Sequence, residues 1–203
     1  TMKTYSLQLA DNQLITYRDR KRHLWLLSMI YPLLALSGVG LYLATGSQWL
    51  LLTPLVSIYG GASLFDWLLG TDKSNPPEEL VPQLEEDPYY RWLPMLTVPL
   101  HVVVLVVIAG FTATHELNWL SILVLALTAG LYSGLAINTA HELGHKKTEL
   151  ERRLARIAAG ISLYGHFCIE HSRGHHRHVA TPEDPASSRM GENIYGFALR
   201  EIP

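Results

Sequence analysis

The sequence of 203 residues is poor in charged side chains and has a single cysteine. Only 17% of the residues are charged, whereas 48% are hydrophobic, and the mean hydropathy is +0.13. This composition disfavours a soluble domain and favours a membrane protein. The lone thiol of Cys168 excludes a disulfide bond within the chain. The net charge of −2 points to no particular class of partner, and we expect no nucleic acid to bind.

Long stretches without charged residues define the predicted membrane helices. No charge occurs between His23 and Asp66, where only Gly46-Ser47-Gln48 interrupts the apolar run, and two further uncharged stretches cover 92–115 and 117–140. Because a bilayer core requires roughly 20 apolar residues per helix, these stretches predict four transmembrane helices. The predicted helices cover about 24–45, 48–69, 92–115 and 117–140.

A fifth apolar segment, about 157–169, is too short to cross a bilayer on its own. We expect it to form a short helix that lies at the membrane interface or re-enters the bundle, packed against the other helices. The predicted fold is therefore a single integral-membrane domain over 1–203, an all-α, multi-pass bundle of transmembrane helices.

The positions of Lys and Arg predict the orientation of this bundle. Positive side chains precede the first predicted helix and follow the fourth, whereas the short loops near residues 46 and 115 have none. The positive-inside rule therefore predicts a cytoplasmic N-terminus, with residues 141–145 at the cytoplasmic face of a bacterial inner membrane. The acidic, proline-rich segment 71–90 either caps this end or is merely a solvated connection. The positive residues are Arg18, Arg20, Lys21, Arg22, Lys146, Lys147, Arg152, Arg153 and Arg156.

Histidines gather just after the fourth predicted helix. Seven of the ten lie between residues 141 and 178, in the motifs HELGH (141–145) and EHSRGHHRH (170–178) and beside them. His141 and His145 are four residues apart on a helix, so both rings project from one face and could chelate one metal ion. This pair alone is weak evidence. The second motif repeats the spacing and adds a neighbouring histidine, although a basic helix at the lipid surface could have the same composition.

The histidines of the two motifs predict a transition-metal site. The candidate ligands number five, whereas structural zinc takes four protein ligands and catalytic zinc usually three. A set of this size suits two ions with open positions for oxygen. Imidazole binds iron, copper, nickel and zinc alike, so the spacing does not select the metal. The candidate ligands are His141, His145, His171, His175 and His176.

HELGH also matches the H-E-x-x-H pattern of zinc metalloproteases, some of which are embedded in membranes. In that interpretation Glu142 is the general base, and His141 and His145 are two of three zinc ligands. The third ligand is normally a carboxylate in an Asp-Gly context on a later membrane helix, and no such segment occurs in these 203 residues. A second histidine motif is also more than a zinc protease needs, so the protease is a distant alternative.

Three segments resemble the integral-membrane alkane monooxygenases. They are HELGHK (141–146), EHSRGHHRHVATPEDPASSRMGE (170–192) and FDWLLGTDKSNPPEE (65–79). The resemblance covers essentially the whole chain, and the second segment is highly specific. Related xylene-type monooxygenases, and fatty-acyl hydroxylases or desaturases with spaced histidine boxes, are the alternatives.

The resemblance implies a specific enzyme chemistry. It implies six membrane helices, two non-haem iron ions at the cytoplasmic side, and hydroxylation of the terminal methyl of medium-chain n-alkanes to 1-alkanols with dioxygen. The alkane enters from the bilayer, and electrons come from NAD(P)H through a reductase and rubredoxin. The ligand roles fall on the five histidines named above. The family has further histidine motifs later in the chain, which this sequence does not contain, so we expect the C-terminal part of the family domain to be absent and the site to be incomplete.

Carboxylates near the motifs are candidates for orienting the ligands. A metal-bound histidine usually donates its other ring N–H to a carboxylate or a carbonyl. Glu142, Glu170, Glu183 and Asp184 lie within reach of the motifs. Glu142 and Glu170 each adjoin a candidate ligand and are ranked first, although each of the four could equally be ordinary surface charge. Apart from the metal site, no side chain is assigned a catalytic role.

Overall fold

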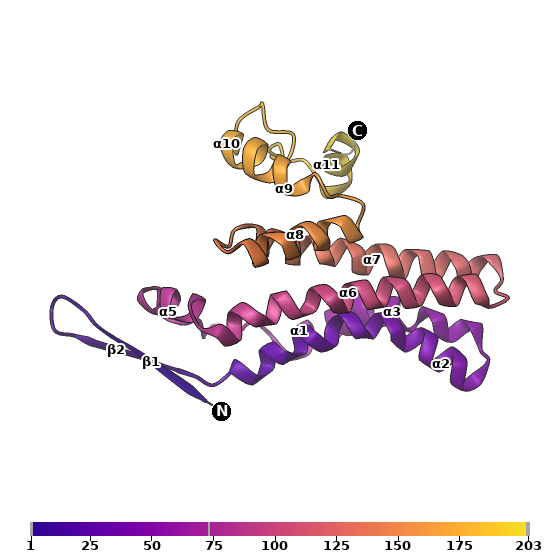
Figure 1. The fold of residues 1–203 in the computed structure, drawn as a ribbon, viewed down its shortest axis with the longest axis horizontal. Helices are drawn as coiled ribbons and strands as arrows, with labels where there is room; N and C mark the ends of the chain where they lie inside the picture. The colour runs from indigo at the N-terminus through magenta and orange to yellow at the C-terminus, as the bar shows by residue number, and fades with distance from the viewer. Residues whose placement is uncertain (1, 73, 202–203) are drawn as a thin grey trace.

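Two long helices, α6 (Pro88–Thr114) and α7 (Trp119–Gly144), lie side by side in the computed structural model, which describes residues 2–72 and 74–201 (Figure 1). Each begins at a residue whose side chain accepts a hydrogen bond from the first turn. Asp87 accepts from the backbone N–H of Tyr89 at 2.9 Å, and Asn118 accepts from that of Ser121 at 2.8 Å. These caps satisfy N–H groups that have no partner within the helix.

Four helical segments of the described residues are long and apolar enough to cross a membrane. They confirm the four predicted helices, although the third begins at residue 88 rather than 92 and the fourth ends at 144 rather than 140. The bounds differ because the caps, and not the charges, decide where a helix begins, and because the fourth helix continues through most of HELGH. The segments are Arg22–Thr45, Gln48–Leu69, Pro88–Thr114 and Trp119–Gly144.

The first two segments are irregular, because short α-helical pieces alternate with 3-10 and π turns. Pro32 and Pro54 lie near the start of η2 and α3, where a proline removes one backbone donor from the helical ladder. The first segment consists of η1 (Arg22–Leu26), α1 (Leu27–Ile30), η2 (Tyr31–Leu36) and α2 (Ser37–Thr45). The second consists of η3 (Gln48–Leu52), α3 (Thr53–Val56), the π-helical η4 (Ser57–Ala62) and α4 (Ser63–Leu69).

The close contact between these two segments depends on Gly38. A Cβ atom there would lie 2.9 Å from the carbonyl oxygen of Leu51 and 3.0 Å from Cδ of Pro54. Because backbone atoms cannot give way easily, we expect Gly38→Ala to destabilise the bundle by about 1–3 kcal/mol. Thermal unfolding in detergent measures this. Gly40→Ala is the matched control, since its Cβ would meet nothing within 4 Å; equal melting temperatures for the two variants would contradict the prediction.

The chain begins with a β-hairpin, which the all-α prediction did not include. Strands β1 (Lys3–Gln8) and β2 (Leu14–Asp19) pair antiparallel, with Tyr5 opposite Tyr17. Asn12 in the turn has a positive φ of 64°, a conformation that asparagine tolerates better than most residues. In Figure 1 the hairpin extends away from the end of the helices at which α6 begins.

Asp87 links this hairpin to the helices through a group that we call the Asp87 cluster (Lys3, Tyr5, Arg22 and Asp87). Asp87 is 4% exposed. Its carboxylate accepts hydrogen bonds from Lys3 at 2.8 Å, from both terminal nitrogens of Arg22 at 2.7 and 3.0 Å, and from the Tyr5 hydroxyl. Hydrogen bonds from Arg22 above all, and then from Lys3 and Tyr5, hold the pKa of Asp87 well below its usual range despite burial. The hairpin is thus fixed to the start of α6.

The segment between the second and third spans packs at the same end. It contains η5 (Glu78–Leu80), in which Leu80 is fully buried, and α5 (Val81–Glu85). The side-chain amide of Gln83 donates to the backbone oxygen of Ser6 in β1 at 3.1 Å, and Lys21 bonds both Asp72 and Ser74. These contacts hold the segment against the hairpin.

The short segment after α7 corrects the prediction of one helix over 157–169. Helix α8 (Glu149–Ile161) begins earlier, because Thr148 and Glu151 form reciprocal capping bonds. Arg91 of α6 also donates to buried Glu151 at 3.1 Å. The chain then turns at Leu163, whose φ is +58°, before the next helix. α8 lies along α7 (Figure 1).

Beyond α8 lies a last layer of short helices (Figure 1). It consists of α9 (Phe167–Glu170), the π-helical η6 (His171–His175), α10 (His176–His178) and α11 (Ile194–Glu201). Between α6, α7 and α8 is a small apolar core that includes Met95, Val98, Leu143 and Ala158. This core positions the end of α7 beneath the histidines of the last layer.

Candidate metal centre

Four histidines from two segments converge where α7 ends. His141 and His145 lie at the end of α7, and His171 and His176 lie on the segment from η6 to α10. One ring nitrogen of each lies within 4.8 Å of one ring nitrogen of every other. The ring centroids of His141 and His171 are 4.4 Å apart, and those of His145 and His176 are 5.0 Å apart. The two sequence motifs therefore form one site.

The π-helical turn η6 decides which histidines of the second motif take part. A π-helix places residues five apart on one face, whereas an α-helix does so for residues four apart. Accordingly Nε2 of His171 lies 3.0 Å from Nε2 of His176. The spacing of four, which the sequence suggested for His171 and His175, instead leaves those rings stacked with centroids 5.3 Å apart.

The surroundings favour the uncharged form of His145 and His171. Burial, and then the neighbouring rings of His141 and His176, lower the pKa of His171 to about 4. Burial, and then the same two neighbouring rings of His141 and His176, also lower the pKa of His145. Each ring is then neutral at pH 7 and has a lone pair on one nitrogen. Four imidazole nitrogens at this separation fit a transition-metal cation, which binds imidazole through a nitrogen lone pair.

His175, the fifth candidate ligand, lies beside this group but not within it. Its Nδ1 is 2.8 Å from Oδ2 of Asp184, which is 4% exposed. Hydrogen bonds from Ser187 first, and then from His175, lower the pKa of Asp184. Because an ionised carboxylate can only accept, Nδ1 of His175 donates and its Nε2 has the free lone pair. A ligand role for His175 stays a prediction.

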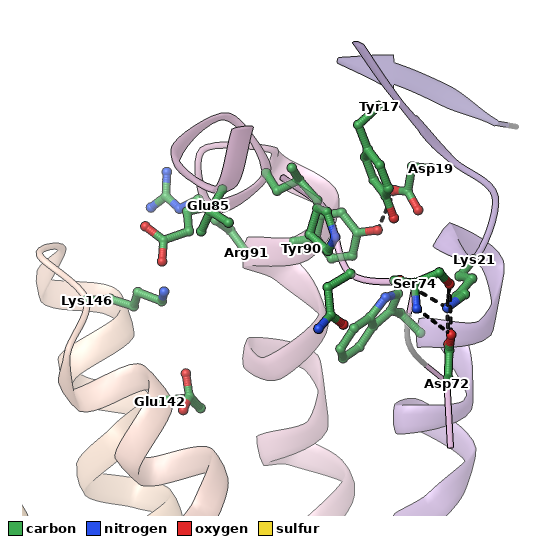
Figure 2. A pocket seen from close by; sticks show the side chains of 15 residues that line it. Tyr17, Asp19, Lys21, Asp72, Ser74, Glu85, Tyr90, Arg91, Glu142 and Lys146 are labelled. Atoms are coloured by element: carbon green, nitrogen blue, oxygen red, sulfur yellow. Dashed lines mark hydrogen bonds and ion pairs between the residues drawn. The ribbon is translucent and has the colours of Figure 1, made fainter. Parts of the chain in front are cut away.

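Of the four candidate carboxylates, Asp184 is the one that bonds a candidate ligand within the described residues. Glu170 accepts from the Tyr164 hydroxyl at 3.2 Å, and its Oε1 lies 3.7 Å from Nε2 of His166. Glu142 lines a cavity whose lining includes none of the candidate ligands (Figure 2). Glu183 is exposed and pairs with His178 at 3.1 Å. Successive residues of a helix point in different directions, so adjacency in the sequence does not by itself bring a carboxylate to a ligand.

Two further residues of the site had no signal in the histidine pattern. Phe167 stacks on His171, with centroids 5.0 Å apart and rings at 18°. Ser187 donates to Asp184 and accepts from the backbone N–H of Ala180 at 2.9 Å. Residues 184–187 (DPAS) form a turn, which is closed by a hydrogen bond of 3.1 Å from the backbone N–H of Ala186 to the side chain of Asp184. Because this turn places Asp184 against His175, the DPAS segment accompanies the second histidine motif.

Asp184→Asn should weaken metal binding while leaving the turn in place. The amide has the same shape but no charge, so it holds the His175 tautomer less firmly. We expect the affinity for ferrous iron or cobalt to fall by about 10–100-fold, the usual effect of losing such a partner. Metal titration of the purified chain measures this. Glu183→Gln, next to it and exposed, is the control, and an equal affinity of both variants would overturn the role of Asp184.

Comparisons with known proteins agree with this architecture. The family model described as "Fatty acid desaturase" matches residues 117–202, which contain both histidine motifs. Alkane 1-monooxygenase 1 of Alcanivorax borkumensis is 52% identical over 96% of this chain and 48% of its own length. The alkane 1-monooxygenases of Ectopseudomonas oleovorans and Pseudomonas putida are 50% and 49% identical, each over 92% of this chain and 47% and 46% of their own length.

The chain thus spans about half the length of the curated relatives it matches. Within that half the identity extends over the membrane helices as well as the histidine motifs. Over nearly its whole length, the chain is therefore similar to a part of these alkane 1-monooxygenases.

Proposed function

We propose that the protein formed by this chain and the remaining part of the family domain hydroxylates the terminal methyl of medium-chain n-alkanes to 1-alkanols with dioxygen. The observation that carries the proposal is the convergence of four imidazole nitrogens within 4.8 Å of one another. The sequence that contains them is 52% identical to a protein named alkane 1-monooxygenase 1. The names of these relatives supply the substrate class, and the imidazoles supply a site for the metal that such chemistry requires.

Two non-haem iron ions are the proposed cofactor. His141, His145, His171 and His176 would hold iron, with His175 as a further ligand held in one tautomer by Asp184. Bound iron supplies the reduction of dioxygen and the oxidation of an unactivated C–H bond, which no protein side chain can perform alone. The further histidine motifs of the family would complete the coordination. The chain's own part is to hold these nitrogens close together.

A cavity of about 330 Å³ beside the histidines offers the alkane a place to bind. It lies between α7, α8 and α9 and touches His141, His145 and His171. Its lining also includes Ala155 and Phe167, whose apolar surface can contact a hydrocarbon chain, beside the side chains of three arginines, Arg152, Arg156 and Arg173. An alkane dissolved in the bilayer can reach such a cavity between helices without crossing water.

We also propose that the histidines face the cytoplasm of a bacterial cell across its inner membrane. The Lys and Arg residues at this end of the bundle support that orientation. Electrons would then come from a cytoplasmic NAD(P)H-dependent reductase through rubredoxin, as the family resemblance implies.

The test uses the intact gene product, purified in detergent. About two iron ions and little zinc per chain, with octane converted to 1-octanol when reductase and rubredoxin are added, would support the proposal. One zinc ion and no iron would overturn it and favour the protease interpretation of HELGH. Iron without octane turnover, but with turnover of xylenes or fatty acyl chains, would replace the substrate and keep the site.

A further inference from the structure

Two cavities adjoin each other, and neither is lined by any of the four converging histidines. The outer one has a volume of about 510 Å³ and lies at the end where the hairpin and α5 pack. The inner one, about 650 Å³, runs down between the first, third and fourth spans. They share the side chains of Trp25, Tyr90, Glu142 and Lys146.

The inner cavity follows one face of each of the three spans. Along α6 its lining runs from Tyr90 to His101, which is roughly 16 Å at 1.5 Å per residue. Trp25 and Tyr31 of the first span and Leu135 of α7 contribute apolar surface to the same wall. The space is therefore elongated and mainly apolar, and it runs into the part of the bundle that crosses the membrane.

The outer cavity has several charged side chains in its lining, and three of them have no partner among the described residues. Lys21 is paired with Asp72, and Arg91 with Glu151. Lys146, Glu142 and Glu85 also line the cavity, and no hydrogen bond or ion pair within the described residues involves their side chains. Figure 2 shows Glu142 on α7 and Lys146 just beyond its end, across the opening from Lys21 and Tyr90.

An aromatic pair marks the junction of the two cavities. The rings of Trp25 and Tyr90 meet edge to face with centroids 6.0 Å apart, and both line both cavities. Tryptophan and tyrosine favour the boundary between hydrocarbon and water. The junction therefore lies at the depth where the headgroup of a lipid meets its acyl chains.

We propose that these joined cavities bind one phosphatidylethanolamine-type phospholipid, with its headgroup in the outer cavity and an acyl chain in the inner one. The unpaired charges are one ammonium and two carboxylates. They complement a headgroup with one phosphate, which Lys146 binds, and one ammonium with N–H donors, which Glu142 and Glu85 bind. The site does not depend on the alkane chemistry proposed above.

The charges also select against other occupants. An anionic lipid such as phosphatidylglycerol would place its phosphate near two unpaired carboxylates without offering them a cation. An alkane would leave all three charged groups of the outer cavity without a partner. A free headgroup would satisfy the charges but would leave the apolar inner cavity unfilled.

Native mass spectrometry of the delipidated protein, titrated with one lipid at a time, tests the site. We expect phosphatidylethanolamine to bind at least tenfold more tightly than phosphatidylglycerol. Lys146→Met and Glu85→Gln should each lower its affinity by roughly tenfold, which is typical of one lost charge-assisted hydrogen bond. Lys147→Met and Glu86→Gln are the matched controls, since these neighbours line neither cavity, and they should bind as the unmodified chain does.

Three results would overturn the proposal. Equal or tighter binding of phosphatidylglycerol would contradict the match of charges. An equal effect of the variants and their controls would remove Lys146 and Glu85 from the site. Binding of glycerophosphoethanolamine, which has no acyl chains, as tightly as the lipid would show that the inner cavity plays no part. Unchanged melting temperatures of all four variants in lipid-free detergent ensure that the affinities refer to folded protein.

Discussion

Replacing His171 by alanine should lower the affinity for ferrous iron by at least about 100-fold, more than the loss of a supporting carboxylate does. His171 occupies the centre of the group. Its Nε2 is 3.0 Å from that of His176, and its ring lies 4.4 Å from His141 and 5.4 Å from His145. Without His171, the ring that lies next to both histidines at the end of α7 and to His176 is missing. The three remaining histidines then no longer surround one metal position. Iron per chain after anaerobic reconstitution measures the effect.

The matched control for this prediction is His178→Ala, which removes a histidine of the same motif. His178 pairs with the exposed Glu183 and does not belong to the group within 4.8 Å. We expect it to bind iron as the unmodified chain does. Both variants should retain the helix content of the parent in circular dichroism. Equal iron content of the two variants would mean that the metal lies elsewhere.

Replacing Asp87 by alanine should produce the largest loss of stability, about 3–5 kcal/mol, because it leaves the mostly buried guanidinium of Arg22 without a partner. The side chains of Asp87 and Arg22 are 3% and 16% exposed. Alanine also removes the cap of α6, which adds about 1 kcal/mol, whereas asparagine can retain the cap and should cost less. Asp72→Asn is the control, since its pair with Lys21 is exposed and should contribute at most about 1 kcal/mol.

The same carboxylate predicts how acid affects the fold. The pKa of Asp87 is lower in the folded chain than the ordinary value of about 3.9 expected when unfolded. Its contribution is therefore complete above that value and is lost progressively as the pH falls further. Unfolding by urea in detergent between pH 5 and pH 2 should show a shallower loss of stability for Asp87→Asn than for the parent. Equal slopes of stability against pH for the variant and the parent would contradict the low pKa of Asp87.

The membrane helices could be predicted because burial in lipid demands long uncharged runs, a signal that needs no tertiary information. The hairpin could not be predicted in the same way. Its strands have only six residues each and do not alternate regularly between polar and apolar residues, and buried Tyr5 bonds Asp87, which lies 82 residues away in the sequence. The ends of the third and fourth helices depend on caps that the charge pattern does not reveal.

The candidate metal centre was predictable in composition but not in detail. The clustering of histidines indicated a metal site, and four of the five candidates do converge. Whether His175 or His176 faces His171 depends on a π turn, which has no reliable sequence signature and arises from local packing. Asp184 could be placed against His175 only once the turn closed by Ala186 and Ser187 was known.

The Asp87 cluster also has a consequence for the order of events during synthesis. Asp87 follows Lys3 by 84 residues and Arg22 by 65. At about 5–20 residues per second, a ribosome reaches it roughly 4–17 s after Lys3. During that interval the first two spans can enter the membrane, but Arg22 has no carboxylate from α6 to pair with. These spans are also less buried within the bundle than the two that follow. The helices that are made first are thus secured only when the third arrives, so a nascent chain that stalls before residue 87 should be the form most exposed to proteolysis.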